Sequence, residues 1–268
     1  MIIGICGLGF VGNAIYSFMN DEINKDIIKE IVVYDKYKKL NDLSVLLKAN
    51  IIYICIPTPY DDITKTYNMN ELDDTLLLLD ELNYRGIILI KSTILPCYCQ
   101  DANNKYTQLL IIHNPEFLSA STAVKDFMEQ THIIIGYTLQ SKYFVNIIEE
   151  FYRLLFPKAV ISINTSNTVA ITKLACNSFY ATKVQFYTEL FLLCERTDIN
   201  YNEVRELMLK NGWIDPHHTS IPGHDGQVSF GGACFPKDIN AFNQYMTACN
   251  IPSEVLQSVI NERNKLRK

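Results

Sequence analysis

The residues with the clearest chemical potential surround Cys234. Two glycines precede this cysteine, and Phe235-Pro236-Lys237-Asp238 follow it. A proline followed closely by an aspartate is typical of the first turn of a helix, so the thiol is expected near a helix N-terminus with a lysine close by. Such a position favours the thiolate, which is the nucleophile in covalent catalysis. A buried cysteine in a turn is the alternative that spacing alone leaves open.

A second group of polar residues lies earlier in the chain. Lys173 and Asn177 are four residues apart in a long predicted helix, so they share one face. Periodicity alone favours a solvated polar stripe for this pair. Ser92, Thr93 and Glu116 each follow a predicted strand. Ligands of open α/β sheets bind at the carboxyl ends of strands, which makes these three residues candidates for a site.

A glycine-rich turn matches the pattern G-x-G-x-x-G. It consists of Gly7, Leu8, Gly9, Phe10, Val11 and Gly12. The turn follows an apolar run and opens a predicted helix, a context in which glycines let the backbone approach a pyrophosphate. Asp35 ends the next predicted strand, where a carboxylate accepts hydrogen bonds from a ribose 2′-hydroxyl and repels a 2′-phosphate. The pattern predicts NAD rather than NADP, although three lysines follow Asp35 closely. A tight turn without a ligand is the alternative.

Seven short runs rich in β-branched residues precede residue 165. They are Ile2–Cys6, Ile31–Tyr34, Ile51–Cys55, Ile87–Ile90, Leu109–Ile112, Ile133–Ile135 and Val160–Ile163. Helix-length stretches separate several of them. This alternation indicates βαβ units and a parallel sheet covered on both faces, which is an α/β, Rossmann-like doubly wound fold.

The pattern changes after Asn164. Residues 166–197 contain neither proline nor glycine and predict one helix of roughly 30 residues, about 45 Å long. Shorter helices are predicted at Tyr201–Lys210, Ile239–Cys249 and Ser253–Arg267, around a glycine-rich loop at Asn211–Gly232. The sequence therefore predicts an NAD-binding domain over residues 1–164. An all-helical dimerisation and catalytic domain, with one long central helix and the cysteine, is predicted over residues 165–268.

The bulk properties exclude several classes of protein. A net charge of -5 argues against a nucleic-acid surface, and no apolar run approaches the length of a membrane span. The N-terminus lacks the basic start of a signal peptide, and the eight cysteines form no C-x-x-C pair. A cytoplasmic protein with reduced cysteines is expected. No metal is expected, because His217, His218 and His224 match no strong zinc pattern.

Seven features occur in a characteristic order along the whole chain. They are Gly7–Gly12, Asp35, Ile56–Pro59, Lys91–Ile94, Asn114–Leu118, Lys173–Asn177 and Gly231–Asp238. Together they resemble the UDP-glucose/GDP-mannose dehydrogenase family. The fifth and the last are far more specific than the glycine turn, which many dehydrogenases share. The resemblance implies NAD as cofactor, a nucleotide-sugar substrate with UDP-glucose expected first, and a homodimer formed through the long helix. It implies no nucleic-acid or membrane partner.

The resemblance also implies a two-step reaction at one sugar carbon. The family oxidises a primary alcohol to a carboxylate with two NAD molecules. By resemblance, Cys234 attacks the intermediate aldehyde, and the thiohemiacetal loses a second hydride to become a thioester that water releases. Lys173 and Asn177 would stabilise the oxyanion.

Further roles come from the same resemblance. Thr93 and Asp238 would hold the water that takes the alcohol proton, and Glu116 would assist thioester hydrolysis. The implied cofactor-binding residues are Gly7, Leu8, Gly9, Phe10, Val11, Gly12, Asp35, Pro57, Thr58, Pro59, Ser92, Thr93 and Lys237. The implied substrate-binding residues are Glu116, Phe117, Leu118, Lys173, Asn177, Phe230 and Gly231.

The sequence departs from the family in three places. Ala120 stands where the family has a second glutamate, and the segment before Gly231 lacks the arginine with which the family reaches the sugar. The sequence stops at Lys268, where the family continues into another nucleotide-binding α/β domain. We therefore expect the loop Trp213–Phe230 to hold the diphosphate, through its histidines and an anion nest at Gly223 and Gly226. A mobile loop that only covers the site is the alternative.

Two other functions fit parts of the pattern. A β-hydroxyacid dehydrogenase would suit the length and the helix lysine, but it needs no nucleophilic cysteine and makes one NADH per substrate. An inactive, dimeric NAD-binding remnant is the non-enzymatic alternative. Retention of every main catalytic residue except the one at Ala120 argues against the remnant.

Overall fold

The computed structural model describes residues 1–267 and divides the chain into two compact units. Unit 1 comprises Met1–Pro59 and Tyr67–Lys173, and unit 2 comprises Tyr60–Thr66 and Leu174–Lys268. The border at Lys173 lies within α6 (Ser166–Thr197), which has the bounds that the sequence predicts. The predicted boundary after residue 164, between the NAD-binding domain and the catalytic domain, remains a prediction.

Unit 1 is built on a seven-stranded sheet with the strand order β2-β1-β3-β6-β7-β8-β9. The strands are β1 (Ile2–Cys6), β2 (Glu30–Tyr34), β3 (Ile51–Ile54), β6 (Ile87–Ile90), β7 (Leu110–His113), β8 (His132–Tyr137) and β9 (Val160–Thr165). All seven predicted strands are present. The predicted parallel, Rossmann-like sheet is confirmed, with one departure: β8 runs antiparallel to β7, and Ile112 faces Tyr137. Residues 114–131 are long enough to connect the two strands in either direction, so the sequence could not reveal this reversal.

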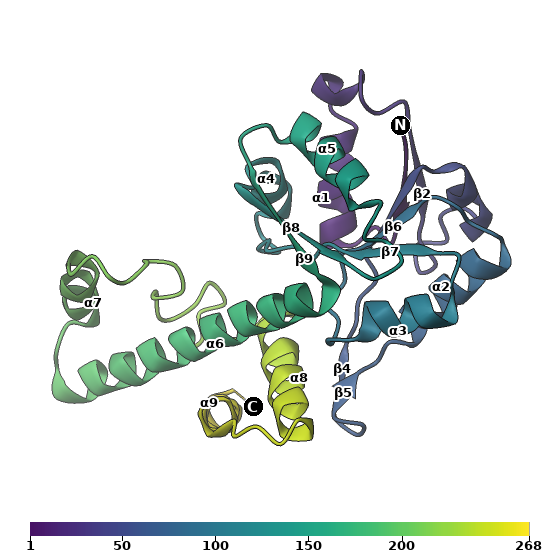
Figure 1. Cartoon of the computed structure of the whole chain (residues 1–268). Helices are drawn as coiled ribbons and strands as arrows, with labels where there is room; N and C mark the ends of the chain where they lie inside the picture. The colour runs from purple at the N-terminus through teal and green to yellow at the C-terminus, as the bar shows by residue number, and fades with distance from the viewer. Residues whose placement is uncertain (268) are drawn as a thin grey trace. The chain divides into compact units, whose positions relative to one another are not determined.

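Helices cover both faces of the sheet (Figure 1). One face packs against α1 (Phe10–Met19), α4 (Ala123–Met128) and α5 (Val145–Leu155), and the other against α2 (Asn70–Glu81) and α3 (Tyr98–Lys105). Alternate residues of β3 separate accordingly: Ile51 and Tyr53 belong to the first core, and Ile52 and Ile54 to the second. This two-residue period explains why the strands read as continuous apolar runs.

Two short 3-10 helices and a hairpin complete unit 1 and its border. The 3-10 helices are η1 (Glu22–Asn24) and η2 (Leu43–Lys48), and the hairpin pairs β4 (Tyr60–Asp61) with β5 (Thr66–Tyr67). The sequence did not predict this hairpin, because two-residue strands are too short to show a periodic pattern.

Unit 2 is helical apart from its share of that hairpin. The remainder of α6 packs with α7 (Tyr201–Lys210), α8 (Phe235–Ala248) and α9 (Glu254–Leu266) around two small apolar cores. The bounds of α7 are those predicted. Helix α8 begins four residues before the predicted Ile239, because Pro236 and Asp238 already belong to its first turn.

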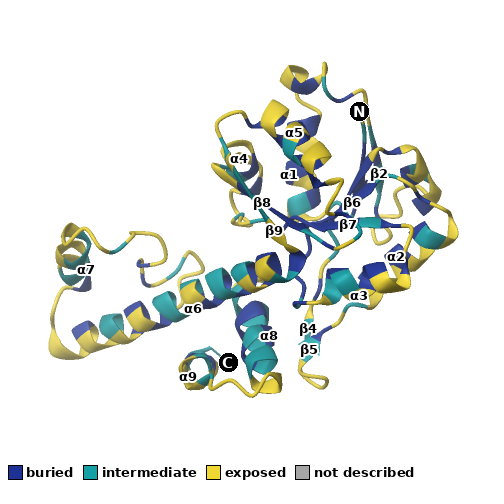
Figure 2. Cartoon of the chain, in the orientation of Figure 1, coloured by how far each residue is buried: buried dark blue, intermediate teal, exposed yellow. Residues whose placement is uncertain are grey.

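The exposed faces of the helices carry both polar and apolar residues, and buried and exposed positions alternate along α6 (Figure 2). Among residues 1–267, no helix combines the length and the apolar character that crossing a membrane requires.

Candidate functional site

The glycine turn lies between β1 and α1, with Gly9 as the N-cap residue of the helix. A Cβ atom at Gly12 would lie 2.0 Å from the Gly7 carbonyl oxygen, so the helix can meet the turn only if this residue has no side chain. A Cβ atom at Gly9 would meet nothing within 4 Å. The open side of the turn therefore lies at a helix N-terminus, which is where a pyrophosphate fits.

Asp35 fastens this turn to the end of β2. Its Oδ2 accepts a hydrogen bond from the Leu8 backbone N–H at 2.7 Å, and its Oδ1 accepts one from the Lys38 N–H at 2.8 Å. Burial alone would raise the pKa of Asp35, but these N–H groups, the Tyr37 N–H and the Lys38 charge together lower it. Asp35 also borders a pocket of about 360 Å³ that includes Tyr34 and Lys36. The sequence pointed to a ribose acceptor here and missed the bond to the glycine turn.

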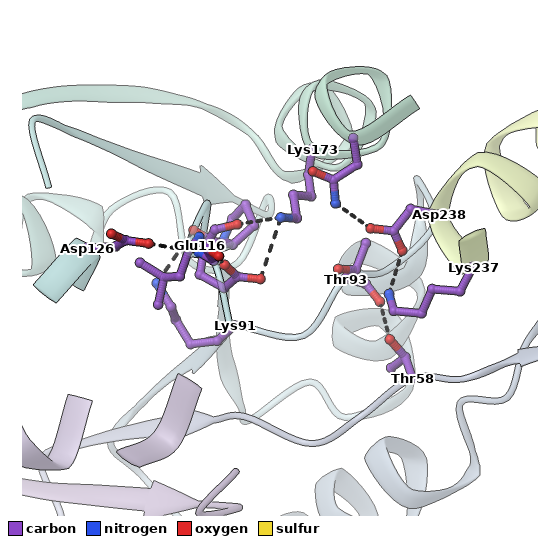
Figure 3. A network of polar contacts seen from close by, with 12 residues as sticks. Thr58, Lys91, Thr93, Glu116, Asp126, Lys173, Lys237 and Asp238 are labelled. Atoms are coloured by element: carbon purple, nitrogen blue, oxygen red, sulfur yellow. Dashed lines mark hydrogen bonds and ion pairs between the residues drawn. The ribbon is translucent and has the colours of Figure 1, made fainter. Parts of the chain in front are cut away.

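Side chains also lock the segments that follow β3 and β6. The Thr58 hydroxyl donates to the Thr93 carbonyl oxygen at 2.7 Å (Figure 3), and the Ser92 hydroxyl donates to the Ile56 carbonyl oxygen at 2.6 Å. Pro57 and Pro59 flank Thr58 in the same segment. The predicted site residues of these two segments thus lie together at the carboxyl edge of the sheet, and Thr58, Ser92 and Thr93 are buried.

Lys173 is buried against the segment that follows β7. Its Nζ donates to the Glu116 carbonyl oxygen at 2.6 Å and lies 3.5 Å from the Glu116 carboxylate (Figure 3). It also lies 4.8 Å from the centre of the Phe117 ring, and Glu116 Oε2 accepts from the Leu118 N–H. Lys173 is 3% exposed, so the solvated-stripe interpretation is wrong for it.

Sequence reasoning gave no role to two residues that support this segment. Lys91 is buried and donates to Asn114 Oδ1 at 3.0 Å, and burial lowers the pKa of Lys91 to about 8. Asp126, on α4, accepts from the Ser119 N–H at 2.8 Å. A carboxylate does therefore reach the segment that contains Ala120, but it comes from a helix rather than from the family's usual position. The only sequence signal for Lys91 was its place in the Lys-Ser-Thr-Ile stretch.

Unit 2 carries the second group of predicted catalytic residues. Cys234 is exposed and is the N-cap residue of α8. In the first turn of that helix the fully buried Asp238 accepts a hydrogen bond from Asn177 Nδ2 at 2.5 Å and forms an ion pair with Lys237 (Figure 3). Asn177 is 4% exposed, so it is not a solvated residue either.

The loop before the cysteine differs from the expected anion clamp. The Gly223 N–H donates to the Gln227 carbonyl oxygen and the Gly226 N–H donates to the Gly223 carbonyl oxygen, both at 2.9 Å. The nest expectation is therefore wrong, because the loop itself uses these two donors. His218 lies 4.8 Å from the Tyr180 ring, between ring centres. Within residues 1–267, no three His, Cys, Asp or Glu side chains cluster closely enough to hold a metal ion.

The two residues near the cysteine that were predicted to bind substrate have contrasting surroundings. Phe230 is buried in the core formed with Ala181, Ile239, Val259 and Ile260. Gly231 is half-buried beside it. Phe230 thus fixes the start of the cysteine turn by packing.

Known proteins match both parts of the chain. The NAD binding domain of the UDP-glucose/GDP-mannose dehydrogenase family matches residues 19–156, and the central domain of that family matches residues 167–265. UDP-glucose 6-dehydrogenase from Rickettsia typhi is 28% identical over 283 residues, which cover 97% of this chain and 63% of that protein. The chain thus spans less than two thirds of the length of this curated relative.

Solved structures show the shared fold. A UDP-glucose dehydrogenase from Pyrobaculum islandicum superposes with a TM-score of 0.82 at 18% identity, covering 98% of this chain and 68% of that one. A 3-hydroxyisobutyrate dehydrogenase from Mycobacterium tuberculosis superposes with a TM-score of 0.74 at 13% identity, covering 98% and 92%. The match to the NAD binding domain of the family alone covers more than half of the residues. The chain therefore belongs to the UDP-glucose/GDP-mannose dehydrogenase family of NAD-dependent nucleotide-sugar dehydrogenases.

Proposed function

We propose that the chain oxidises the primary alcohol of UDP-glucose to the carboxylate of UDP-glucuronate in two steps, with Cys234 as the nucleophile. The observation that carries the proposal is the start of α8. There the exposed Cys234 is the N-cap residue, and the first turn of the helix contains Asp238, which is buried and bonded to Asn177 and Lys237. A helix N-terminus and a neighbouring ammonium both favour the thiolate. One bound sugar can be oxidised twice if the reactive aldehyde is held covalently.

NAD supplies the hydride acceptor in each of the two oxidations. The residues present fit that cofactor: the open side of the turn at Gly9 suits a pyrophosphate, and the ionised carboxylate of Asp35 would hold a ribose hydroxyl. The same negative charge disfavours a 2′-phosphate, which supports NAD over NADP.

The proposed chemistry assigns separate tasks to the polar residues. In the first oxidation, Thr93 and Asp238 hold a water that takes the alcohol proton. The Cys234 sulfur then bonds to the aldehyde carbon, and the carbonyl oxygen becomes an oxyanion. Lys173 and Asn177 stabilise that oxyanion, and they lie one turn apart on α6.

The second oxidation converts the thiohemiacetal into a thioester. Water then attacks the thioester carbon with assistance from Glu116. This attack breaks the carbon–sulfur bond and releases the acid and the thiol. The Glu116 carboxylate is held by the Leu118 N–H and by the Lys173 ammonium, so its position is fixed before substrate binds.

A single oxidation of a β-hydroxyacid is the second candidate. The fold match to 3-hydroxyisobutyrate dehydrogenase, with a TM-score of 0.74, is the observation that favours it. The buried Lys173 would serve either reaction. The arrangement around Cys234 and Asp238 would have no task in a single oxidation, which is why we favour the two-step reaction.

We also propose that two copies associate through α6. Phe179, Phe186 and Leu193 recur every seven residues on this helix, and each is more than half exposed. Apolar residues with this spacing form a stripe that suits a second helix. Sedimentation of the unaltered protein and of Phe186→Asp tests this proposal. If both proteins sediment as monomers, the proposal is contradicted. If the unaltered protein is a dimer and Phe186→Asp is a monomer, it is supported.

The decisive test of substrate is NADH production from a panel of UDP- and GDP-sugars, with β-hydroxyacids as the competing class. We expect UDP-glucose to give the highest kcat/KM. Turnover of a β-hydroxyacid without turnover of any nucleotide sugar would replace the proposal with the second candidate.

A further inference from the structure

Arg267, the C-cap residue of α9, holds the segment that leads to Cys234. Arg267 Nη1 and Nη2 donate to the Asp225 carboxylate at 2.6 and 3.2 Å. Its Nε donates to the Val228 carbonyl oxygen at 2.8 Å, and its Nη2 donates to the Ser229 carbonyl oxygen at 2.7 Å. One guanidinium whose side chain is 10% exposed thus bonds three residues of a single short segment. A rigid fork of donors suits this task better than an ammonium would.

Helix α6 holds the same segment from another direction. The Ser229 N–H donates to Thr188 Oγ1 at 2.9 Å, and the Ser229 hydroxyl donates to Gln185 Oε1 at 2.5 Å. Residues 231–233 alone separate the buried Phe230 from Cys234, the N-cap residue of α8. Both ends of the turn from Phe230 to Cys234, the cysteine turn, are therefore held in place.

Gly231 lies directly against this guanidinium. A Cβ atom at Gly231 would lie 2.1 Å from Arg267 Nη1 and 3.2 Å from Asp225 Oδ2. Any side chain at this position has to displace Arg267 from its acceptors. The glycine and the arginine are therefore parts of one arrangement, although 36 positions separate them.

We propose that Arg267, paired with Asp225, is a positioning residue for the nucleophile: it fixes the turn that presents Cys234 to the sugar. This inference rests on the proposed role of Cys234. A misplacement of about 1 Å can cost on the order of a hundredfold in rate, so a brace of this kind acts on kcat without touching substrate.

The first test is Arg267→Ala in the full chain. We expect kcat to fall roughly tenfold to a hundredfold, with the KM for NAD unchanged. Millimolar ethylguanidinium should restore part of the kcat, because it can occupy the vacated donor position; loss of stability alone would not respond in this way. Arg153→Ala is the matched control, since Arg153 forms an exposed ion pair with Glu149 in unit 1. An unchanged kcat, or a loss that ethylguanidinium does not relieve, overturns the proposal.

The second test is a double-mutant cycle with Gly231→Ala. Each single substitution should displace or remove the guanidinium, so the double variant should be little worse than Arg267→Ala alone. Losses that multiply would show that Gly231 and Arg267 act independently, and they would contradict the arrangement.

The third test needs no turnover. We expect iodoacetamide to alkylate Cys234 about threefold to tenfold more slowly in Arg267→Ala than in the unaltered protein, as measured on the peptide by mass spectrometry, because a released turn no longer holds the thiol at the helix N-terminus. An equal or faster alkylation rate in Arg267→Ala contradicts the proposed positioning role of Arg267. If the unaltered protein makes no acid but this rate changes as expected, the proposed function fails and the brace stands.

Discussion

The turn at residues 7–12 and the turn that ends at Cys234 both contain glycines and both lead into a helix, yet they are held in different ways. The first continues from β1, which pairs with β2 and β3, and the Asp35 carboxylate bonds its backbone. The second follows no strand and depends on the side chains of Arg267, Gln185 and Ser229. A turn held by a sheet has its place set by backbone pairing. A turn held by side chains depends on a few distant residues, so single substitutions should affect it more.

The largest effect is expected at the cysteine itself. Cys234→Ala removes the sulfur that forms the proposed thioester, so acid formation should fall roughly a thousandfold or more. NAD affinity should not change, because the residues proposed to bind NAD lie chiefly at the other turn. Product analysis and NAD titration measure the two effects. Near-normal acid formation by this variant would remove Cys234 from the reaction.

The next largest effect is expected at Lys173. Its buried ammonium is the proposed oxyanion donor, so Lys173→Ala should lower kcat on the order of a hundredfold. Lys183→Ala is the control on the same helix, since Lys183 bonds only the Asp215 carbonyl oxygen in the described structure. Equal kinetics for the two variants would show that Lys173 has a purely structural role.

The first turn should respond differently when its side-chain anchor is removed. Asp35→Asn leaves β1 paired but removes the charge of the carboxylate that accepts a hydrogen bond from the Leu8 N–H. The KM for NAD should therefore rise about tenfold, and discrimination against NADP should weaken. The alkylation rate of Cys234 should stay unchanged. Asp21→Asn is the control, because Asp21 also accepts from a backbone N–H at a remote helix end. A KM for NAD that stays constant in Asp35→Asn would contradict the role of Asp35.

The last effect is on stability rather than on catalysis, and it concerns the sheet that holds the first turn. Burial lowers the pKa of His113 at the end of β7 to about 3, against 6.5 for an ordinary histidine. The unfolded chain therefore binds a proton below pH 6.5 that the folded chain refuses, and the free energy of unfolding should fall as the pH drops from 6.5 towards 3. At pH 4.5 the loss should be about 3 kcal/mol. Urea titrations should show a shallower pH dependence for His113→Gln, and parallel curves would contradict this assignment.

The sequence predicted unit 1 well because its signals are local. Each strand is a short apolar run, and the glycine turn and Asp35 stand at strand ends, where a sheet places ligand-binding residues. The direction of β8 was not predictable, since the connection from β7 permits either course. The bond from Asp35 to Leu8 was missed because the motif suggests a ligand for that carboxylate and not a protein partner.

The sequence predicted the helices of unit 2 but not what holds the cysteine turn. Helix α6 contains neither proline nor glycine, and its bounds were correct. Arg267 lies 33 residues beyond Cys234, and nothing about its type or neighbours marks it as a partner of Asp225. The burial of Lys173 was also hidden, because a lysine at helical spacing is normally solvated and its partner Glu116 is 57 residues away.

The central claim is that one sugar is oxidised twice on one cysteine, and the most direct measurement is the ratio of NADH to acid formed. Purified protein with NAD and UDP-glucose should give two NADH per UDP-glucuronate, with no free aldehyde. A reproducible ratio of one, with aldehyde or ketone accumulating, would contradict the two-step reaction through Cys234.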